Sequence, residues 1–226
     1  MNSESPGSDV LGGLQARIDP LLRRVLTRSF DLGFLGSMPI DDQIDHALGF
    51  VAVIEGRIGA PPRSVIDLGT GGGVPGLVLV SCWPQTRVVL MDASERRTGF
   101  LSETLEGWDG GRNAEVVRGR AEELGRKTGM REQFEAVTSR SFGTPALTAE
   151  CGSAFLAVEG WMVVSEPPDL PSGLRWPTDG LALVGLEPVG SSRVAGRFGY
   201  QVLRKAAAIG DRFPRRVGVP AKRPVF

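Results

Sequence analysis

The chain has 226 residues, of which 41% are apolar and 23% charged, and its 26 basic residues balance 26 acidic ones. This size suits one α/β domain with an extension. No stretch is long and apolar enough for a membrane span, the polar N-terminus is unlike a signal peptide, and the two cysteines lie in no disulfide or zinc pattern. We therefore expect a cytoplasmic, monomeric protein with no membrane contact and no metal.

The N-terminal part of the chain is expected to be helical. Asp19 followed by Pro20 is typical of a helix start, and apolar residues continue at helical spacing as far as Phe30. A second helix is predicted from Asp41 to Gly59. We divide the chain into a disordered N-terminus (residues 1–9), a helical extension (10–60), a main domain (61–206) and a basic tail (207–226).

The main domain alternates between predicted strands and predicted helices. The expected strands are residues 64–68, 87–91, 115–117, 134–139, 161–164, 181–186 and 200–205, and the expected helices are 75–82, 94–105, 121–126 and 145–158. Repeated strand–helix units with continuous apolar strands predict an α/β fold, with a mostly parallel seven-stranded sheet that is covered on both faces.

The most informative stretch is the glycine-rich segment 65–76, which runs from a predicted strand through a turn into a predicted helix. Its glycine spacing also fits the dinucleotide-binding pattern. Asp67, at the strand end, would repel a pyrophosphate but would suit the positive sulfonium and ammonium groups of S-adenosylmethionine. Asp92 ends the next strand, where a carboxylate can accept hydrogen bonds from both ribose hydroxyls. These features favour S-adenosylmethionine as the cofactor, with the alternative that Asp67 only caps the following helix.

Several short blocks of sequence occur together: segment 67–76 with its Pro-Gly ending, the Arg96-Arg97 pair followed by Phe100-Leu101, segment 117–123, segment 139–142, and the tail segment 213–224. In this combination the chain resembles the ribosomal RNA small-subunit methyltransferase G family, the 16S rRNA guanine-N7 methyltransferases that are also called glucose-inhibited division protein B. The resemblance implies a Rossmann-like class I methyltransferase fold, S-adenosylmethionine as methyl donor, and 16S rRNA or the small ribosomal subunit as partner.

The resemblance also implies roles for particular positions. With Asp67, the implied cofactor-binding residues are Gly69, Gly71, Val74, Asp92, Ala121, Glu122 and Arg140. Arg140 is also the candidate catalytic residue, because it would sit at the mouth of the cofactor site near the target base. The residues implied to face RNA phosphates are Arg96, Arg97, Arg120 and, in the tail, Arg215, Arg216, Lys222 and Arg223.

The residues that other methyl-transfer chemistries would need are missing from the expected site. Guanine N7 carries a free lone pair and no proton, so its methylation needs a dry, aligned site rather than a general base. The only histidine, His46, lies outside the main domain and is expected to be structural. Cys82 and Cys151 fall in helical patterns and are expected in the core, which disfavours an enzyme with a cysteine nucleophile.

The chain departs from the family pattern at two informative places. Ser165-Glu166 occupies a position where the family usually has Lys-Gly, and Gly72 one where it usually has Ala or Pro. With the zero net charge, Glu166 leaves open a methyltransferase that acts on a small molecule or a protein. A non-catalytic cofactor-binding module and a nicotinamide oxidoreductase are further alternatives, and cofactor titration with turnover assays separates them.

Overall fold

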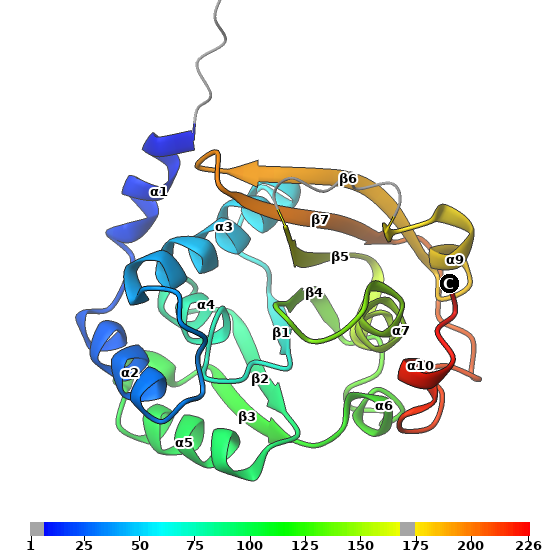
Figure 1. Ribbon diagram of the computed structural model, residues 1–226, viewed down its shortest axis with the longest axis horizontal. Helices are drawn as coiled ribbons and strands as arrows, with labels where there is room; N and C mark the ends of the chain where they lie inside the picture. Colours follow the sequence, from blue (N-terminus) through cyan, green and yellow to red (C-terminus); the bar gives the residue numbers. More distant parts are fainter. Residues whose placement is uncertain (1–6, 168–174) are drawn as a thin grey trace, which may run out of the picture.

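The computed structural model describes residues 7–167 and 175–226, which form a seven-stranded sheet in the order β3-β2-β1-β4-β5-β7-β6 (Figure 1). Strands β1 to β5 run parallel to their neighbours among themselves, and β7 is antiparallel to both β5 and β6. The α/β class and the mostly parallel seven-stranded sheet predicted from the sequence are therefore confirmed.

The elements have the following bounds. The strands are β1 (Ser64–Leu68), β2 (Arg87–Asp92), β3 (Ala114–Arg118), β4 (Phe134–Ser139), β5 (Leu156–Glu166), β6 (Leu186–Val194) and β7 (Phe198–Lys205). The helices are α1 (Gly7–Gln15), α2 (Pro20–Asp31), α3 (Ile40–Ile58), α4 (Gly76–Cys82), α5 (Glu95–Glu106), η1 (Asp109–Gly111), α6 (Ala121–Leu124), α7 (Pro145–Phe155), α9 (Thr178–Ala182) and α10 (Val219–Lys222).

Three helices precede the sheet, and two of them begin or end as the sequence predicts. The Asp19 side chain accepts a hydrogen bond from the Leu21 N–H at 2.7 Å and caps α2. Helix α3 ends where Gly59 adopts a φ of +82°. Helix α1 corrects one expectation, because residues 7–9, expected to be disordered, are helical. Residues 1–6 of that expected segment lie outside the described residues.

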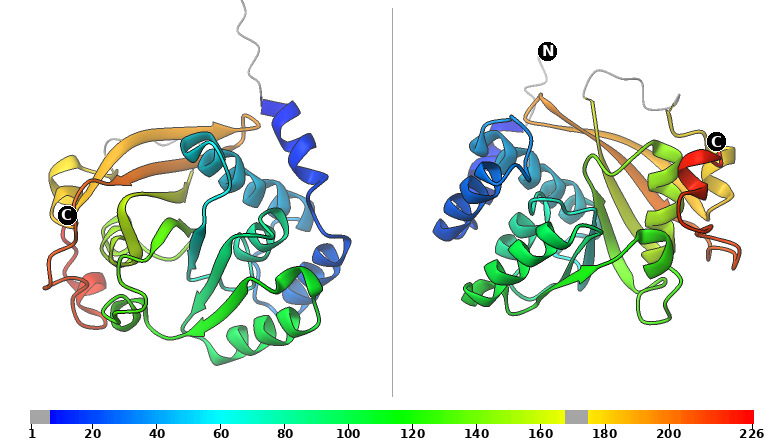
Figure 2. Two further views of the ribbon diagram at one scale, coloured as in Figure 1. Left: turned by 180° about the vertical axis from the view of Figure 1, so that it is seen from behind. Right: turned by 60° about the horizontal axis from the view of Figure 1, so that its bottom comes forward.

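Helices cover both faces of the sheet, as two further views show (Figure 2). Helices α2 to α5 pack on the face that includes Val65 and Val88, and α6, α7 and α9 pack on the face that includes Ile66 and Val89. Because both faces of the central strands β1, β2 and β4 are covered, most successive residues in these strands are buried. This double cover explains the unbroken apolar runs from which the strands were predicted.

Three predicted segments of the main domain are wrong in their bounds or type. Helix α7 ends at Phe155 rather than at residue 158, and β5 is longer than the predicted segment 161–164. A register shift opposite β4 and a φ of +71° at Glu159 mark an irregularity in β5 that the apolar pattern did not reveal. The predicted strand 181–186 is mostly helix α9 and turn, and β6 begins only at Leu186.

The C-terminal segment predicted as a basic tail docks on the domain. Phe213 and Pro220 are buried. The Arg131 guanidinium donates hydrogen bonds at 2.8 Å to the carbonyl oxygens of Ile209 and Phe213. The tail is therefore an ordered part of the molecule, beside α6 and α7 (Figure 1).

Within the described part of the chain, none of the helices combines the length and the apolar composition needed to cross a bilayer.

Candidate functional site

The glycine-rich turn follows β1 and is shaped by close packing as well as by backbone conformation. Gly69 and Gly71 adopt φ values of +71° and +58°, which residues with side chains rarely take. A Cβ atom on Gly72 would lie 2.3 Å from Ser29 Oγ, which instead donates a 2.8 Å hydrogen bond to the Gly72 carbonyl. Packing against α2 therefore explains why this position holds glycine rather than a larger residue.

Asp67 is buried beneath the turn and is bound entirely by protein groups. One carboxylate oxygen accepts a hydrogen bond from the Gly76 N–H and the other from the Thr138 hydroxyl, both at 2.9 Å. Burial raises the pKa of Asp67 to about 6, although these hydrogen bonds act in the opposite direction. With 1% of its surface exposed, Asp67 fixes the start of α4 to β4. This placement favours the helix-capping alternative and corrects the expectation that Asp67 faces the methyl donor.

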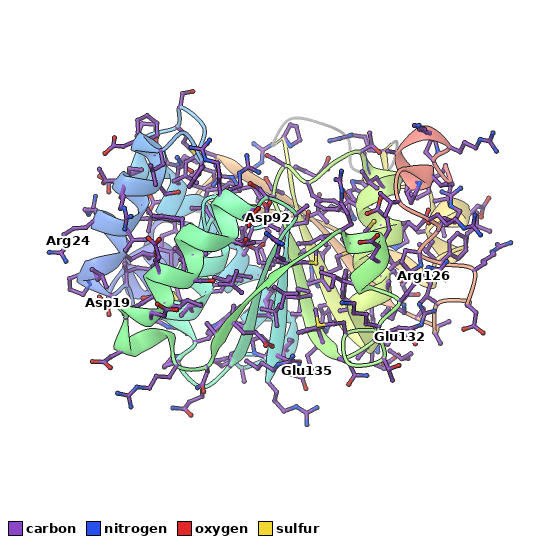
Figure 3. All side chains as sticks on the ribbon, turned by 90° about the horizontal axis from the view of Figure 1, so that it is seen from below. Asp19, Arg24, Asp92, Arg126, Glu132 and Glu135 are labelled. Carbon is purple, nitrogen blue, oxygen red and sulfur yellow. The ribbon has the colours of Figure 1, made fainter. Side chains whose placement is uncertain are left out.

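Asp92 stands at the carboxyl end of β2 and connects the turn to the next helix. Its two oxygens accept hydrogen bonds from the Gly71 N–H at 3.0 Å and the Ser94 N–H at 2.8 Å. Figure 3 shows Asp92 at the end of the sheet opposite Glu135, which lies near the start of β4. A carboxylate offers about four lone-pair sites, so Asp92 retains acceptor capacity for ligand hydroxyls.

A first pocket, with a volume of about 310 Å³, opens at the carboxyl ends of β1, β2 and β3. It is lined by Gly69, Met91, Asp92, Ala93, Gly119, Arg120, Ala121, Glu122, Phe142, Leu147, Val217, Gly218 and Ala221. The structure thus brings together four of the residues predicted to bind the cofactor: Gly69, Asp92, Ala121 and Glu122. Of the others, Gly71 contacts the pocket through Asp92, while Val74 is buried in the core outside it.

The tail supplies one wall of the first pocket, which sequence reasoning missed. Val217, Gly218 and Ala221 line the pocket, and the Gly218 N–H donates a 3.0 Å hydrogen bond to the Glu122 carboxylate. This wall is anchored where the Arg215 guanidinium and backbone N–H bind the fully buried Glu150 carboxylate at 2.5 to 3.0 Å. The local sequence around Glu122 in α6 and Glu150 in α7 contains no pattern that would predict their contacts with the tail.

A second pocket, of about 420 Å³, lies beside the first, and Phe142 lines both. Its walls come from α3, from the ends of β4 and β5, and from β7 and the segment before α9. The lining residues are Met38, His46, Ser139, Ser141, Phe142, Gly143, Pro145, Thr148, Val164, Ser165, Glu166, Pro167, Arg175, Trp176, Arg197, Phe198 and Gly199. Ser141, which lines this pocket next to Phe142, adopts a φ of +57°.

His46 belongs to this second pocket, although it comes from the N-terminal extension. Its Nε2 lies 3.0 Å from the Ser165 hydroxyl, and its ring stacks on Tyr200 at 5.4 Å between centroids. Burial lowers the pKa of His46 to about 3, and the positive charge of Arg140 adds to this effect. The ring is therefore neutral at neutral pH. Its hydrogen-bond partner, Ser165, is one of the residues at which the chain departs from the family pattern.

Arg140 points inward and does not line either pocket. Its Nη2 lies 3.3 Å from Gln43 Oε1, and its Nη1 has no hydrogen-bond partner among the described residues. Burial lowers the pKa of Arg140, whereas the negative charge of Asp67 opposes that shift. The guanidinium thus lies close to Asp67 and His46 and lines neither pocket, whereas the sequence predicted it at the mouth of the cofactor site.

The arginines expected to face RNA differ in their surroundings. Arg97 lies 3.7 Å from the Asp92 carboxylate and Arg215 is bound to Glu150, so both have partners within the chain. The Arg96 guanidinium lies over the Phe34 ring at 5.6 Å. The exposed members of the set are Arg96, Arg120, Arg216, Lys222 and Arg223.

The two cysteines are buried, as predicted, and so lie in the core. Burial raises the pKa of Cys82 to about 12 and also raises the pKa of Cys151, so neither is a ready thiolate. Within residues 7–167 and 175–226, no three His, Cys, Asp or Glu side chains are grouped so as to hold a metal ion.

Comparison with solved structures identifies the class of protein. A putative O-methyltransferase from Klebsiella pneumoniae matches with a TM-score of 0.59 and 12% identity, over 89% of this chain and 97% of that one. The cofactor-bound protein Rv0187 from MTB matches with a TM-score of 0.57 and 19% identity, over 90% and 99% of the two chains. With the glycine turn after β1 and the carboxylate that ends β2, this fold is that of a class I methyltransferase.

Sequence comparisons place the chain within that class. A family model described as rRNA small subunit methyltransferase G matches residues 44–166. Ribosomal RNA small subunit methyltransferase G of Thermotoga sp. (strain RQ2) is 34% identical over 167 residues, 72% of each chain. The protein of that name from Leuconostoc citreum is 31% identical over 171 residues, 72% of this chain and 69% of its own. The chain belongs to the rRNA small subunit methyltransferase G family and is a methyltransferase.

Proposed function

We propose that this protein transfers a methyl group from S-adenosylmethionine to N7 of a guanine in 16S rRNA. The observation that carries the proposal is the pair of adjoining pockets at the carboxyl edge of the sheet, with Phe142 between them, in a chain of this family. A methyl donor in one pocket and an acceptor in the other would meet at a single shared wall.

The residues of the first pocket fit S-adenosylmethionine. Asp92 can accept hydrogen bonds from the ribose hydroxyls, and apolar side chains of Met91 and Leu147 can flank the adenine. At Gly69 a Cβ atom would lie 2.7 Å from the Phe142 ring, so the absence of a side chain allows this ring to pack against the turn at the junction of the pockets. The bound cofactor supplies an electrophilic methyl group.

The second pocket fits an acceptor that needs no deprotonation. N7 of guanine presents a lone pair, so the protein has only to hold the base in line and keep water away. The one histidine of the chain is neutral and hydrogen-bonded to Ser165. Its place beside the pocket suits a positioning role, and the proposed reaction requires nothing more of it.

A methyl-transfer assay tests the proposal. Small ribosomal subunits, or their 16S rRNA, from a strain that lacks the gene are incubated with the protein and labelled S-adenosylmethionine, and the RNA is digested to nucleosides. Label is expected in N7-methylguanosine. Asp92→Asn should lose cofactor binding and labelling, whereas Asp109→Asn, an exposed aspartate in η1, should retain both. Cofactor binding without label in guanine would contradict the proposal and favour a small-molecule or protein acceptor.

Arg140 is proposed to position the wall between the two pockets. Arg140→Ala removes a guanidinium close to Asp67, Gln43 and His46, so the loop that follows β4 should lose its alignment. We expect methyl transfer to fall at least about tenfold, the equivalent of 1.4 kcal/mol. Labelling rates and thermal unfolding are compared in parallel. Equal fractional losses of activity and of folded protein would show that Arg140 supports only the fold.

A further inference from the structure

The second pocket has flat, apolar walls of the kind that receive a heterocyclic base. Phe198 and Trp176 are buried at 7% and 2% exposure, and Phe142 is half-buried at the junction with the first pocket. Enzymes that modify a base in RNA or DNA bind it outside the stack, between aromatic or apolar side chains, and recognise it at its Watson–Crick edge. A pocket of about 420 Å³ has room for one such base.

Buried polar groups of the same pocket lack partners within the described residues. Among them are Ser139 Oγ, on a fully buried residue, and His46 Nδ1, on a residue that is 6% exposed. Buried polar atoms in proteins nearly always form hydrogen bonds, so unpaired ones that line a cavity indicate that the cavity receives a polar ligand. These atoms come from β4 and α3, so the pocket is assembled from separate elements.

Glu166 provides the negative group of this pocket. It ends β5 and forms an ion pair with Arg175, which also lines the pocket. Burial raises the pKa of Glu166, while the charge of Arg175 opposes the shift. An arginine that holds a carboxylate in this way limits its rotation and leaves further lone pairs for a ligand.

We infer that the second pocket binds the target guanine, with the Glu166 carboxylate accepting hydrogen bonds from its N1–H and 2-amino groups. This inference rests on the proposed function and names the residue that selects the base. A carboxylate accepts from two adjacent donors, and guanine presents N1–H and the 2-amino group side by side. Adenine presents an unprotonated N1 at that edge and no 2-amino group, so it would be repelled. Selection of the base is thus the function assigned to Glu166, at a position where the family usually has the glycine of a Lys-Gly pair.

The same orientation accounts for which ring atom is methylated. N7 and the N1/N2 edge lie on opposite sides of the fused guanine ring. Holding the N1/N2 edge at Glu166 therefore leaves N7 free to face the wall that the second pocket shares with the first. Since both hydrogen-bonding groups at that edge are engaged in a Watson–Crick pair, the target guanine must be unpaired when it binds.

A matched pair of substitutions on one strand tests this inference. Glu166→Gln removes the charge at the pocket, and Glu159→Gln makes the same change at the other end of β5, where the carboxylate is also paired with an arginine. Glu166→Gln should lower kcat/KM for 16S rRNA about tenfold or more, the scale of a lost charge-assisted hydrogen bond. Its affinity for S-adenosylhomocysteine should not change, and Glu159→Gln should behave as wild type. Wild-type kcat/KM in Glu166→Gln would overturn the inference.

Nucleotide binding provides a second readout that requires no rRNA activity and no stable variant. Wild-type protein saturated with S-adenosylhomocysteine is titrated calorimetrically with guanosine, inosine and adenosine monophosphates. The expected order of affinity is guanosine, then inosine, which lacks the 2-amino group, then adenosine. Equal affinities would overturn the inference even if rRNA is methylated. Guanosine selectivity in a protein that leaves rRNA unmethylated would support the pocket assignment while the proposed substrate fails.

Discussion

Two carboxylates at neighbouring strand ends have separate tasks in this site. Asp67 directs both oxygens to protein groups and is buried, so it shapes the turn from beneath. Asp92 binds the Gly71 N–H and still lines the first pocket, so it connects the turn to whatever the pocket contains. A change in the turn should therefore affect ligand binding through Asp92, and Gly71 is the residue at which to make it.

Gly71→Val should weaken cofactor binding more than it weakens the fold. At a φ of +58° a Cβ atom would meet nothing closer than 3.8 Å, so the cost is conformational rather than a clash. A left-handed conformation costs an L residue roughly 1–2 kcal/mol, and we expect a loss of S-adenosylmethionine affinity of about tenfold or more. Calorimetric titration measures it, with Gly99→Ala in α5 as the control, because there a Cβ has free space. Undiminished affinity would show that the turn does not shape the pocket.

His46 should make the fold sensitive to acid. Its pKa is about 3 in the folded protein and 6.5 ordinarily, so between these values the unfolded chain binds more protons and the free energy of unfolding falls as the pH falls. His46→Asn cannot titrate, so it lacks this loss. The stability of wild type relative to the variant should fall between pH 7 and pH 4, by as much as about 3 kcal/mol. Urea unfolding of both proteins across this range measures the difference in stability. Asp67 also titrates in this range, but it is present in both proteins, so its contribution cancels in the comparison. A difference independent of pH would contradict the assigned burial of a neutral ring.

At the scale of elements, the strands that carry the site could be predicted because their two faces are both covered. Burial on both faces gives β1, β2 and β4 consecutive apolar residues at their centres. The edge strand β6 alternates between exposed and less exposed residues and contains Pro188 and Gly190, so its sequence lacks that signal. The tail was misjudged for a related reason: its contacts with Glu150 and Glu122 join residues far apart in the chain, and no local pattern encodes them.

Arg215→Lys tests whether the docked tail forms a working wall of the first pocket. Lysine keeps the positive charge beside buried Glu150 but cannot reproduce the several hydrogen bonds of the guanidinium and its Nε. We expect a loss of stability of about 1 kcal/mol and a several-fold weaker affinity for S-adenosylhomocysteine. Arg216→Lys, at the exposed neighbouring position, is the matched control. If thermal unfolding shifts while affinity does not, the ion pair supports the fold alone.

At the scale of the whole molecule, the balance of charge limits how RNA can be bound. With 26 basic and 26 acidic residues, the protein has no overall positive field to attract a polyanion. Several arginines are also neutralised within the chain, among them Arg97 and Arg215 near the first pocket. Attraction to phosphate must therefore come from local exposed groups, and the tail brings Arg216 and Lys222 to the rim of that pocket.

These two residues should contribute to the salt dependence of RNA binding and to nothing inside the pockets. Each phosphate contact on single-stranded RNA contributes about 0.7 to the slope of log affinity against log salt concentration. The double variant Arg216→Ala/Lys222→Ala should therefore lower that slope by about 1.4 and weaken binding to small-subunit rRNA at low salt. Its affinity for S-adenosylhomocysteine should equal that of wild type. Arg112→Ala/Lys127→Ala removes the same two residue types from exposed positions that line neither pocket, and should leave the slope unchanged. Equal slopes for wild type and for the tail variant would place the RNA on another face of the molecule.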